Sequence, residues 1–405
     1  MVNIAVLGYG TVGSGVVEVI NTNSEIINKN AGEEINVKYV LDLRDFPGDP
    51  VEKILVHDFD AILNDEDVKI VVEVMGGTGA AYKFVKASLL AGKSVCTSNK
   101  ALVALYGPEL ISIAKEKNVA FLFGASVGGG IPIIRPLRAC ITADRVDAIT
   151  GILNGTTNYI LTQMDKEGWD FDKALKKAQE MGFAEANPEA DIEGYDACRK
   201  IAILSSLVAG KHVNFEKIYT EGITKITARD IEYAKKCNRS IKLLASSVND
   251  GDNHYAMVAP FMIPESHPLF AVSGVFNAIM VSGNVLDDVM FYGSGAGKLP
   301  TASAVVSDVV EAAKCKNPED ISVEWDADEL ELTSTENASR RFFVRIKGSV
   351  ADNADEYKAK FGNIEIVTLD GVTDEFGIVT ESVSEKLFND KIAGDDKVLG
   401  RIRLA

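Results

Sequence analysis

The pattern of apolar and polar positions predicts alternating strands and helices over the first 132 residues. Helices, for example over residues 80–91 and 108–117, alternate with apolar strands expected at residues 3–7, 36–41, 70–74, 94–97 and 120–123. Strands that are apolar along their whole length and alternate with helices are typical of a parallel sheet covered on both faces. Residues 1–132 are therefore predicted to form a doubly wound, Rossmann-type α/β domain.

The remainder of the chain has a different pattern. Residues 133–300 combine a long amphipathic helix with strands of antiparallel character, such as 274–281, which predicts an α+β domain. A helix over 301–315 is expected to pack back on the first domain. The stretch 316–341 is rich in acids and is expected to be a solvated connector, and 342–405 follows a strand–helix–strand–strand–helix–strand order.

Composition limits the kinds of protein that this chain can be. The formal net charge of −17 argues against a nucleic-acid partner, because an acidic surface repels phosphate backbones. No apolar run reaches the ~18 to 20 residues of a membrane span, and a strand expected two residues after Met1 leaves no room for a leader peptide. The five cysteines are far apart and form no CxxC pair, so we expect a reduced, cytoplasmic protein.

A glycine-rich loop follows the first predicted strand and leads into a helix. Such a loop allows a tight turn and brings backbone N–H groups close to a pyrophosphate at the helix N-terminus. A strand–helix turn without a ligand is the alternative, but the strand before and the helix after this loop favour a dinucleotide. The residues expected to contact it are Gly8, Gly10, Thr11, Val12 and Gly13.

Two charged residues at the end of the second strand bear on which dinucleotide binds. Asp42 stands where an acid can accept a hydrogen bond from the ribose 2′-hydroxyl of NAD. Arg44, two residues later, could instead pair with the 2′-phosphate of NADP. The choice between NAD and NADP stays open.

Ligands of open α/β sheets bind outside the carboxyl ends of the strands, and two further loops lie there. Gly76 and Gly77 follow the third strand and give a ligand close access to the backbone. Ser98 and Lys100 follow the fourth strand, just before an apolar helix. A lysine at the positive end of a helix dipole is mildly unfavourable, so contact with a cofactor or substrate explains it better than an ordinary surface position.

A second group of charged residues opens a helix in the middle domain. Asp196 and Lys200 are four residues apart and share one helical face, with Glu185 and Asp191 shortly before them. A surface ion pair is the simpler interpretation, but the helix is apolar nearly all round after Lys200, which predicts burial. A buried lysine among carboxylates suits proton transfer at an alcohol oxygen, and the spare carboxylates suit a substrate ammonium group. The residues alone thus suggest dehydrogenase chemistry on an amino-acid-like alcohol or aldehyde.

The sequence resembles the homoserine dehydrogenase family in its monofunctional form over about residues 1–315. The resemblance rests on the glycine loop and on segments 97–102, 125–132, 151–159, 182–200 and 293–308. It implies interconversion of L-homoserine and L-aspartate 4-semialdehyde with NAD or NADP, in the aspartate-derived pathway to threonine and methionine. It also implies a homodimer or higher homo-oligomer that pairs through the middle domain.

The resemblance assigns roles to individual residues. Lys200 would be the proton donor and acceptor, and Asp196 would orient the substrate and this lysine. Glu185 would bind the substrate amino group, and Lys100 would lie between nicotinamide and substrate. Further substrate contacts would come from Asp191, Asn154 and Thr156, and further cofactor contacts from Gly182, Gly295 and Gly297.

Two departures from the family pattern carry their own expectations. Gly124 stands where the family often has a glutamate beside a sodium site, so a sodium ion would rest on the backbone carbonyls of Val127, Gly129 and Ile131. Residues 342–405 resemble a shortened ACT domain, a βαββαβ fold, but its usual turn is replaced by residues 348–353. Two alternatives stay open, namely another NAD(P) dehydrogenase of an amino-acid aldehyde and a dinucleotide sensor without catalysis.

Overall fold

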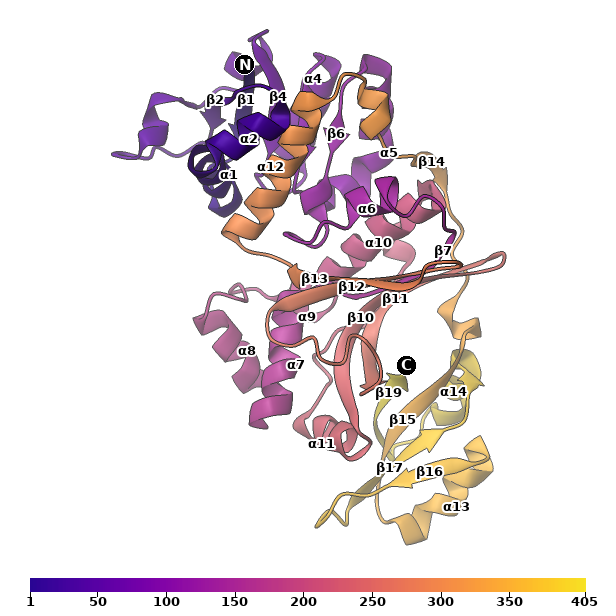
Figure 1. The fold of residues 1–405 in the computed structure, drawn as a ribbon. Coiled ribbons are helices and arrows are strands. Elements are labelled where there is room, and N and C mark those ends of the chain that lie inside the picture. Colours follow the sequence, from indigo (N-terminus) through magenta and orange to yellow (C-terminus); the bar gives the residue numbers. More distant parts are fainter. The chain divides into compact units, whose positions relative to one another are not determined.

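A computed structural model describes residues 1–405, which form two compact units (Figure 1). Unit 1 consists of residues 1–146, 202–216 and 283–330, and unit 2 consists of residues 147–201, 217–282 and 331–405. Each unit is thus assembled from three separate stretches of chain. The finer division into four sequence segments stays a prediction.

Unit 1 is built on a six-stranded parallel sheet with the order β3-β2-β1-β4-β5-β6. The predicted parallel sheet is confirmed, and only the short strand β3 was not expected, because two residues are too few to give a periodic signal. The strands are β1 Val2–Leu7, β2 Ile35–Leu41, β3 Leu55–Val56, β4 Val68–Glu73, β5 Ser94–Thr97 and β6 Phe121–Leu122.

The helices of unit 1 cover this sheet. Helix α12 packs against α1 so closely that a Cβ on Gly15 would lie 3.0 Å from the Cβ of Ala302. The predicted helix 108–117 is the second half of α5, since Pro108 suggested a helix start but lies inside the helix. The helices are α1 Thr11–Thr22, α2 Ser24–Ala31, α3 Asp60–Leu63, α4 Gly79–Leu90, α5 Lys100–Lys117, α6 Ile134–Ala139 and α12 Lys298–Lys314.

The acidic segment after α12 is not fully solvated as expected. All four residues of β14 (Asp326–Glu329) are exposed, and this strand pairs with β8 (Lys211–His212). Trp325, however, is only 3% exposed, and its ring lies against Gly107 in α5. Trp325 thus helps to fix this acidic segment, together with the buried Val323, and burial of a large apolar side chain stabilises by roughly 1.5–3 kcal/mol.

Unit 2 contains a mixed sheet with the order β12-β7-β10-β11-β19-β15-β17-β16. The neighbours β11 and β19 are parallel, and the other pairs from β7 to β16 are antiparallel. The long hairpin of β10 and β11 was not predicted, although both strands are largely buried. The strands are β7 Val146–Ile152, β10 Arg239–Asp250, β11 Asn253–Pro264, β12 Phe276–Gly283, β15 Ser339–Lys347, β16 Ile364–Val367, β17 Glu375–Thr380 and β19 Val398–Leu404.

The helices of unit 2 include those that carry the predicted substrate residues. Helices α7, α9 and α10 belong to the middle of the chain, and the C-terminal segment follows the predicted order of strands and helices with one short extra strand, β18 Val383–Ser384. The helices are α7 Gly155–Glu167, α8 Phe171–Glu180, α9 Glu189–Ile192, α10 Tyr195–Ala209, α11 Ala228–Lys236, α13 Val350–Phe361 and α14 Glu385–Ile392. No helix of the chain is both long and apolar enough to span a membrane.

Candidate functional site

The glycine loop after β1 forms the turn that the sequence predicted. Gly8 has φ +96°, which favours glycine, and a Cβ on Gly13 would lie 1.9 Å from the Gly8 carbonyl oxygen. At Gly10, the residue before helix α1, a Cβ would meet nothing within 4 Å. The first and third glycines therefore shape the turn, and the second leaves open space in front of the helix N-terminus.

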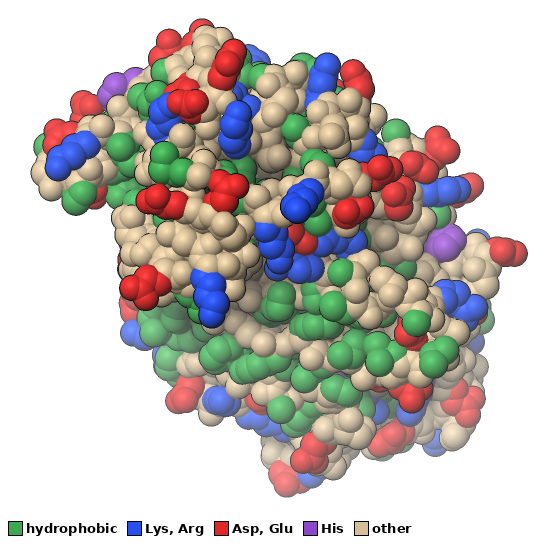
Figure 2. Space-filling view, turned by 45° about the horizontal axis from the view of Figure 1, so that its top comes forward, with side chains coloured by type: hydrophobic (Ala, Val, Ile, Leu, Met, Phe, Trp, Pro, Cys, Tyr) green, Lys and Arg blue, Asp and Glu red, His purple; other side chains and the backbone are tan.

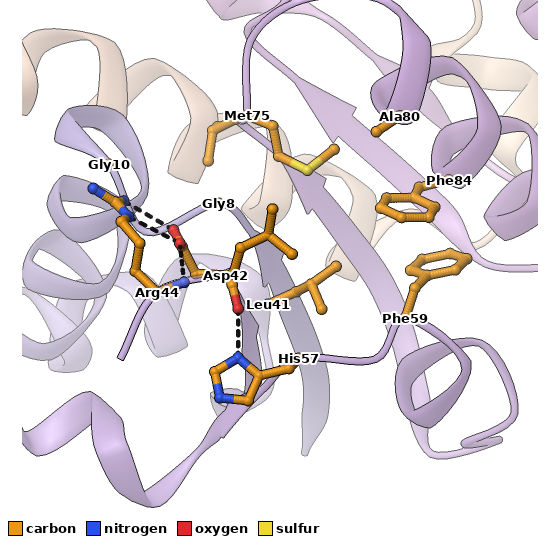
Figure 3. A pocket seen from close by; sticks show the side chains of 12 residues that line it. Gly8, Gly10, Leu41, Asp42, Arg44, His57, Phe59, Met75, Ala80 and Phe84 are labelled. Carbon is orange, nitrogen blue, oxygen red and sulfur yellow. Dashed lines mark hydrogen bonds and ion pairs between the residues drawn. The ribbon is translucent and has the colours of Figure 1, made fainter. Parts of the chain in front are cut away.

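A cavity of about 490 Å³ extends from this turn (Figure 3). Its lining includes Gly8, Gly10, Asp42 and Arg44, which were predicted to contact the dinucleotide, and Met75 just before the Gly76-Gly77 loop. The stacked rings of Phe59 and Phe84, with centroids 4.2 Å apart, form an apolar part of the lining. A cavity with an apolar wall and a glycine turn has the features of a nucleotide site.

Asp42 and Arg44 form a close pair in this cavity, as Figure 3 shows. The Arg44 guanidinium donates from Nε to Asp42 Oδ1 and from Nη2 to Asp42 Oδ2, both at 3.0 Å, and the Tyr9 N–H donates to Oδ2 at 2.8 Å. The hydrogen bond from Arg44 is the main reason that the pKa of Asp42 lies well below its usual range. His57, which was not predicted, contacts the Asp42 backbone carbonyl at 2.7 Å.

A buried acid connects the two other predicted cofactor loops. Glu73, which is fully buried at the end of β4, accepts hydrogen bonds from the Met75 N–H at 2.9 Å and from Thr97 Oγ1 at 2.6 Å. Asn99 continues the connection, since its Nδ2 donates to the Gly77 carbonyl at 2.7 Å. Burial raises the pKa of Glu73.

Sequence reasoning missed Glu73 and Asn99, although a signal for Glu73 was present. An acid in an otherwise apolar buried strand must have hydrogen-bond partners. Lys100 is the first residue of α5, as expected, and lies directly after Asn99, the capping residue of that helix.

In unit 2 the structure brings together Asn154, Asp191, Asp196 and Lys200. Lys200 Nζ donates to Asp196 Oδ2 and to the Leu153 carbonyl, both at 2.7 Å. Asn154 Nδ2 donates to Asp191 Oδ1 at 2.7 Å and to Asp196 Oδ2 at 2.9 Å. The predicted burial is confirmed, because Lys200 is 8% exposed and Asp196 4%. The simpler interpretation of a surface ion pair is therefore wrong.

The other residues that were predicted to bind the substrate lie in or near this cluster. Burial, and then the nearby Asp196 carboxylate, raise the pKa of Asp191. Thr156 Oγ1 donates to the Phe183 carbonyl at 2.6 Å and so holds the loop after α8. Glu185 lies exposed on that loop, outside the hydrogen-bonded cluster, and Gly182 has φ +74° at its start.

The remaining glycines that were predicted as site residues, Gly129, Gly295 and Gly297, lie in unit 1. The Gly130 N–H donates to the Ser294 carbonyl at 3.0 Å, and a Cβ on Gly129 would lie 2.6 Å from the Gly295 carbonyl oxygen. Gly297 has φ +118° and precedes helix α12. The structure contains no group of three or more His, Cys, Asp or Glu side chains that could hold a metal ion.

Each unit thus has, by itself, features that suit dehydrogenase chemistry. A dinucleotide at the glycine turn would carry the hydride, and a buried lysine with carboxylate neighbours can move the proton that accompanies it. The class of protein that these features define is a dinucleotide-dependent dehydrogenase.

Comparison with known proteins identifies the particular family. Residues 8–124 match the family model "Homoserine dehydrogenase, NAD binding domain", and residues 132–310 match the model "Homoserine dehydrogenase". The homoserine dehydrogenase of Pseudomonas aeruginosa is 35% identical over 98% of this chain and 96% of its own length. That of Neisseria gonorrhoeae is 43% identical over 77% of this chain and 72% of its own length.

Solved structures give the same result. The structure of a homoserine dehydrogenase from Thiobacillus denitrificans has a TM-score of 0.89 and 35% identity, covering 100% of this chain and 98% of that one. A hyperthermophilic archaeal homoserine dehydrogenase in complex with NADPH has a TM-score of 0.64 and 30% identity, covering 78% and 99%. The chain belongs to the homoserine dehydrogenase family, whose members are oxidoreductases that use a nicotinamide dinucleotide.

Proposed function

We propose that this chain interconverts L-homoserine and L-aspartate 4-semialdehyde with Lys200 as proton donor and acceptor. The observation that carries the proposal is the burial of Lys200 between the Asp196 carboxylate and the Leu153 carbonyl. An ammonium group has three N–H donors, and two are used in these contacts. The third is left for a substrate oxygen.

A nicotinamide dinucleotide would supply the hydride chemistry at the terminal carbon of the substrate. In oxidation, neutral Lys200 takes the hydroxyl proton while the oxygen becomes that of an aldehyde. In reduction, protonated Lys200 returns a proton to the same oxygen. Asp196 and Leu153 hold the lysine in place, and Lys100 is proposed to contact nicotinamide and substrate.

The carboxylates around Asn154 are proposed to recognise the substrate ammonium group. Asp191 is one of them, and Glu185 on the loop held by Thr156 is another. Because Asn154 donates to both Asp191 and Asp196, it offsets part of their mutual repulsion, and a bound ammonium would offset the rest.

Lys200→Met tests the proposal, with Lys242→Met as the matched control. We expect turnover to fall by ~10²-fold or more while dinucleotide binding persists, because the proposed proton donor and acceptor is removed and no residue of the glycine turn is changed. Lys242 is also a buried lysine of unit 2, with Nζ 2.6 Å from the Val272 carbonyl, and burial lowers its pKa to about 8. Its loss should reduce stability more than turnover. Undiminished turnover in Lys200→Met would remove Lys200 from the mechanism.

We propose that the cavity accepts both NAD and NADP. Arg44 already occupies the Asp42 carboxylate, so a ribose 2′-hydroxyl has to share that acceptor, whereas a 2′-phosphate would draw Arg44 towards itself. The two effects oppose each other, and we expect Michaelis constants within ~10-fold of one another. Steady-state oxidation of homoserine with each coenzyme in parallel measures the ratio.

A homodimer is proposed because a broad apolar area lies on one face of the molecule (Figure 2). Exposed apolar side chains gather on β13 (Asp287–Ser294) and the turn before it, where Val285 is 74% and Tyr292 55% exposed. Large exposed apolar areas mark interaction surfaces, and a second copy of this chain is the proposed occupant. Light scattering should give twice the chain mass of 43.6 kDa.

Three further expectations stay proposals. The C-terminal sheet order β19-β15-β17-β16 suits a βαββαβ, ACT-like unit, and inhibition by added threonine would reveal amino-acid sensing. A sodium ion is proposed on the carbonyls of Val127, Gly129 and Ile131, where it would share the Ile131 carbonyl with the Ile133 N–H, which lies at 2.9 Å. Replacement of sodium by choline tests it. We keep the cytoplasm as the proposed location.

A further inference from the structure

The turn that carries Asp191 rests on a second segment, residues 220–223. The Ile223 N–H donates to the Ile192 carbonyl at 2.8 Å. A Cβ on Gly222 would lie only 2.2 Å from that same carbonyl oxygen, so the two backbones touch without any side chain between them. Movement of segment 220–223 is therefore passed directly to the Asp191 turn.

Segment 220–223 is held in turn by the charge of Glu221. The Glu221 carboxylate accepts hydrogen bonds from Arg403 Nη1 at 2.6 Å, Arg401 Nη1 at 3.2 Å and the Tyr219 hydroxyl at 2.9 Å. Burial alone would raise the pKa of Glu221, but the two guanidinium groups outweigh it and lower the pKa. The Glu221 N–H also donates to the Val258 carbonyl in β11 at 2.8 Å.

Arg403 is the anchor of this arrangement. It lies in β19 with 0% exposure, and its Nε is 3.1 Å from both carboxylate oxygens of Glu385, while Nη2 also bonds to Glu385. Glu385 is itself 2% exposed at the start of α14. The Arg403 guanidinium is thus held on two sides by carboxylates, and removing it would take from the buried Glu385 its nearest partner and leave Glu221 with Arg401 and Tyr219.

We propose that Arg403, acting through Glu221, is a positioning residue for homoserine binding. It fixes segment 220–223, which fixes the Asp191 turn and so the 2.7 Å contact of Asp191 with Asn154. Binding groups must be held within about 0.5 Å of their working geometry, which is a tolerance that loss of this anchor would exceed. The inference rests on the proposed role of Asp191 in binding the substrate.

Arg403→Met, Arg403→Lys and Glu221→Gln test the inference, with Lys397→Met as control. Lys397 lies next to β19 and pairs with Glu356 at 2.8 Å on the surface, so its replacement removes a charge from the same region without touching the anchor. For Arg403→Met we expect the homoserine KM to rise about 10-fold, with kcat within about threefold and the coenzyme KM unchanged. Arg403→Lys should be intermediate, because a lysine can reach one carboxylate only.

Glu221→Gln keeps the inference falsifiable if Arg403→Met folds poorly, since glutamine has the size of glutamate. It should raise the homoserine KM severalfold at a temperature where unfolding scans show the variant to be folded. Asp191→Asn is measured in parallel. If Asp191→Asn raises the homoserine KM and folded Glu221→Gln does not, the inference about Arg403 is overturned. If Asp191→Asn leaves the KM unchanged, the proposed role of Asp191 is the part that fails.

Discussion

Two helices, α5 in unit 1 and α7 in unit 2, are each preceded by a capping asparagine, and the two asparagines are used in different ways. Asn99 caps α5 by accepting the Leu102 N–H at 3.1 Å, and its Nδ2 donates to a backbone carbonyl, that of Gly77. Asn154 caps α7 by accepting the Thr157 N–H at 2.8 Å, and its Nδ2 donates to two carboxylates. The side-chain amide thus contacts backbone at the proposed nucleotide site and carboxylates at the proposed substrate site.

The largest expected effect tests the glycine turn of unit 1, which backbone contacts shape. Gly13→Ala should abolish coenzyme binding, because its Cβ would lie 1.9 Å from the Gly8 carbonyl oxygen and the turn would have to open. Overpacking of this kind costs about 1–3 kcal/mol or more, so unfolding scans should also show a lower Tm. Isothermal titration with NAD and NADP measures the loss.

Gly10→Ala is the matched control for that variant. The same methyl group is added at Gly10, the residue before α1. There a Cβ meets nothing within 4 Å, and φ is −84°. Stability should change little, and only the approach of the pyrophosphate should be affected. Equal stability losses for Gly13→Ala and Gly10→Ala would contradict the turn geometry described here.

The second largest expected effect tests the charged cluster around Asn154. Asn154→Asp keeps the acceptor that caps α7 but replaces the two Nδ2 donors by a third carboxylate beside Asp191 and Asp196. We expect kcat/KM for homoserine to fall by ~10²-fold, since lost hydrogen bonds and like-charge repulsion act together. Coenzyme affinity should remain.

Asn99→Asp provides the reciprocal measurement. It keeps the cap of α5 but loses the bond to Gly77, so it should weaken coenzyme binding by about 10-fold and leave the homoserine KM nearly unchanged. If both asparagine variants alter the same Michaelis constant, the division of labour between the two helices is wrong.

A smaller effect is expected from the pair in the nucleotide cavity. Arg44→Ala should raise the NADP KM by about 10-fold, because a charge-assisted contact to the 2′-phosphate is lost. The same variant frees the Asp42 carboxylate for a ribose hydroxyl, so the NAD KM should fall slightly. Steady-state kinetics with both coenzymes measure the two changes, and a parallel rise in both constants would speak against the proposed pairing.

The smallest expected effect is a difference in pH dependence. Arg44 lowers the pKa of Asp42, whereas burial and Asp196 raise the pKa of Asp191. As pH falls, Asp191 therefore gains its proton before Asp42 does. As the pH is lowered towards the range in which carboxylates titrate, the homoserine KM should therefore rise at a higher pH than that at which protonation of Asp42 affects the coenzyme KM. A coenzyme KM that rises with the homoserine KM would contradict this assignment.

The nucleotide side could be predicted from the sequence to a large extent. Its turn is local, so the spacing of Gly8, Gly10 and Gly13 after an apolar strand was enough, and the Asp42–Arg44 pair lay two residues apart. What could not be predicted is how loops from different strands join. The link from Glu73 to Thr97 crosses two neighbouring strands and has no periodic signal.

The substrate side was predictable only where it is helical. The spacing of Asp196 and Lys200 placed both on one face, but nothing local links Asn154 to Asp191, 37 residues away. Glu221 and Arg403 are 182 residues apart, and the sequence does not reveal that the loop of Glu221 meets the strand β19 of Arg403. Trp325 shows the same limit, since one aromatic residue in an acidic segment does not indicate its distant partner Gly107.

The position of β19 has a consequence for the order in which the protein can fold. This strand, residues 398–404, lies between β11 and β15 in the sheet, and it pairs Arg403 with Phe261 across 142 residues of chain. During synthesis, β11 leaves the ribosome long before β19 exists, so the edge of the hairpin at Phe261 and Met262 stays unpaired until residues 398–404 have been made. Completion of the sheet should thus be a late, slow step, and the exposed edge a point where premature chains associate.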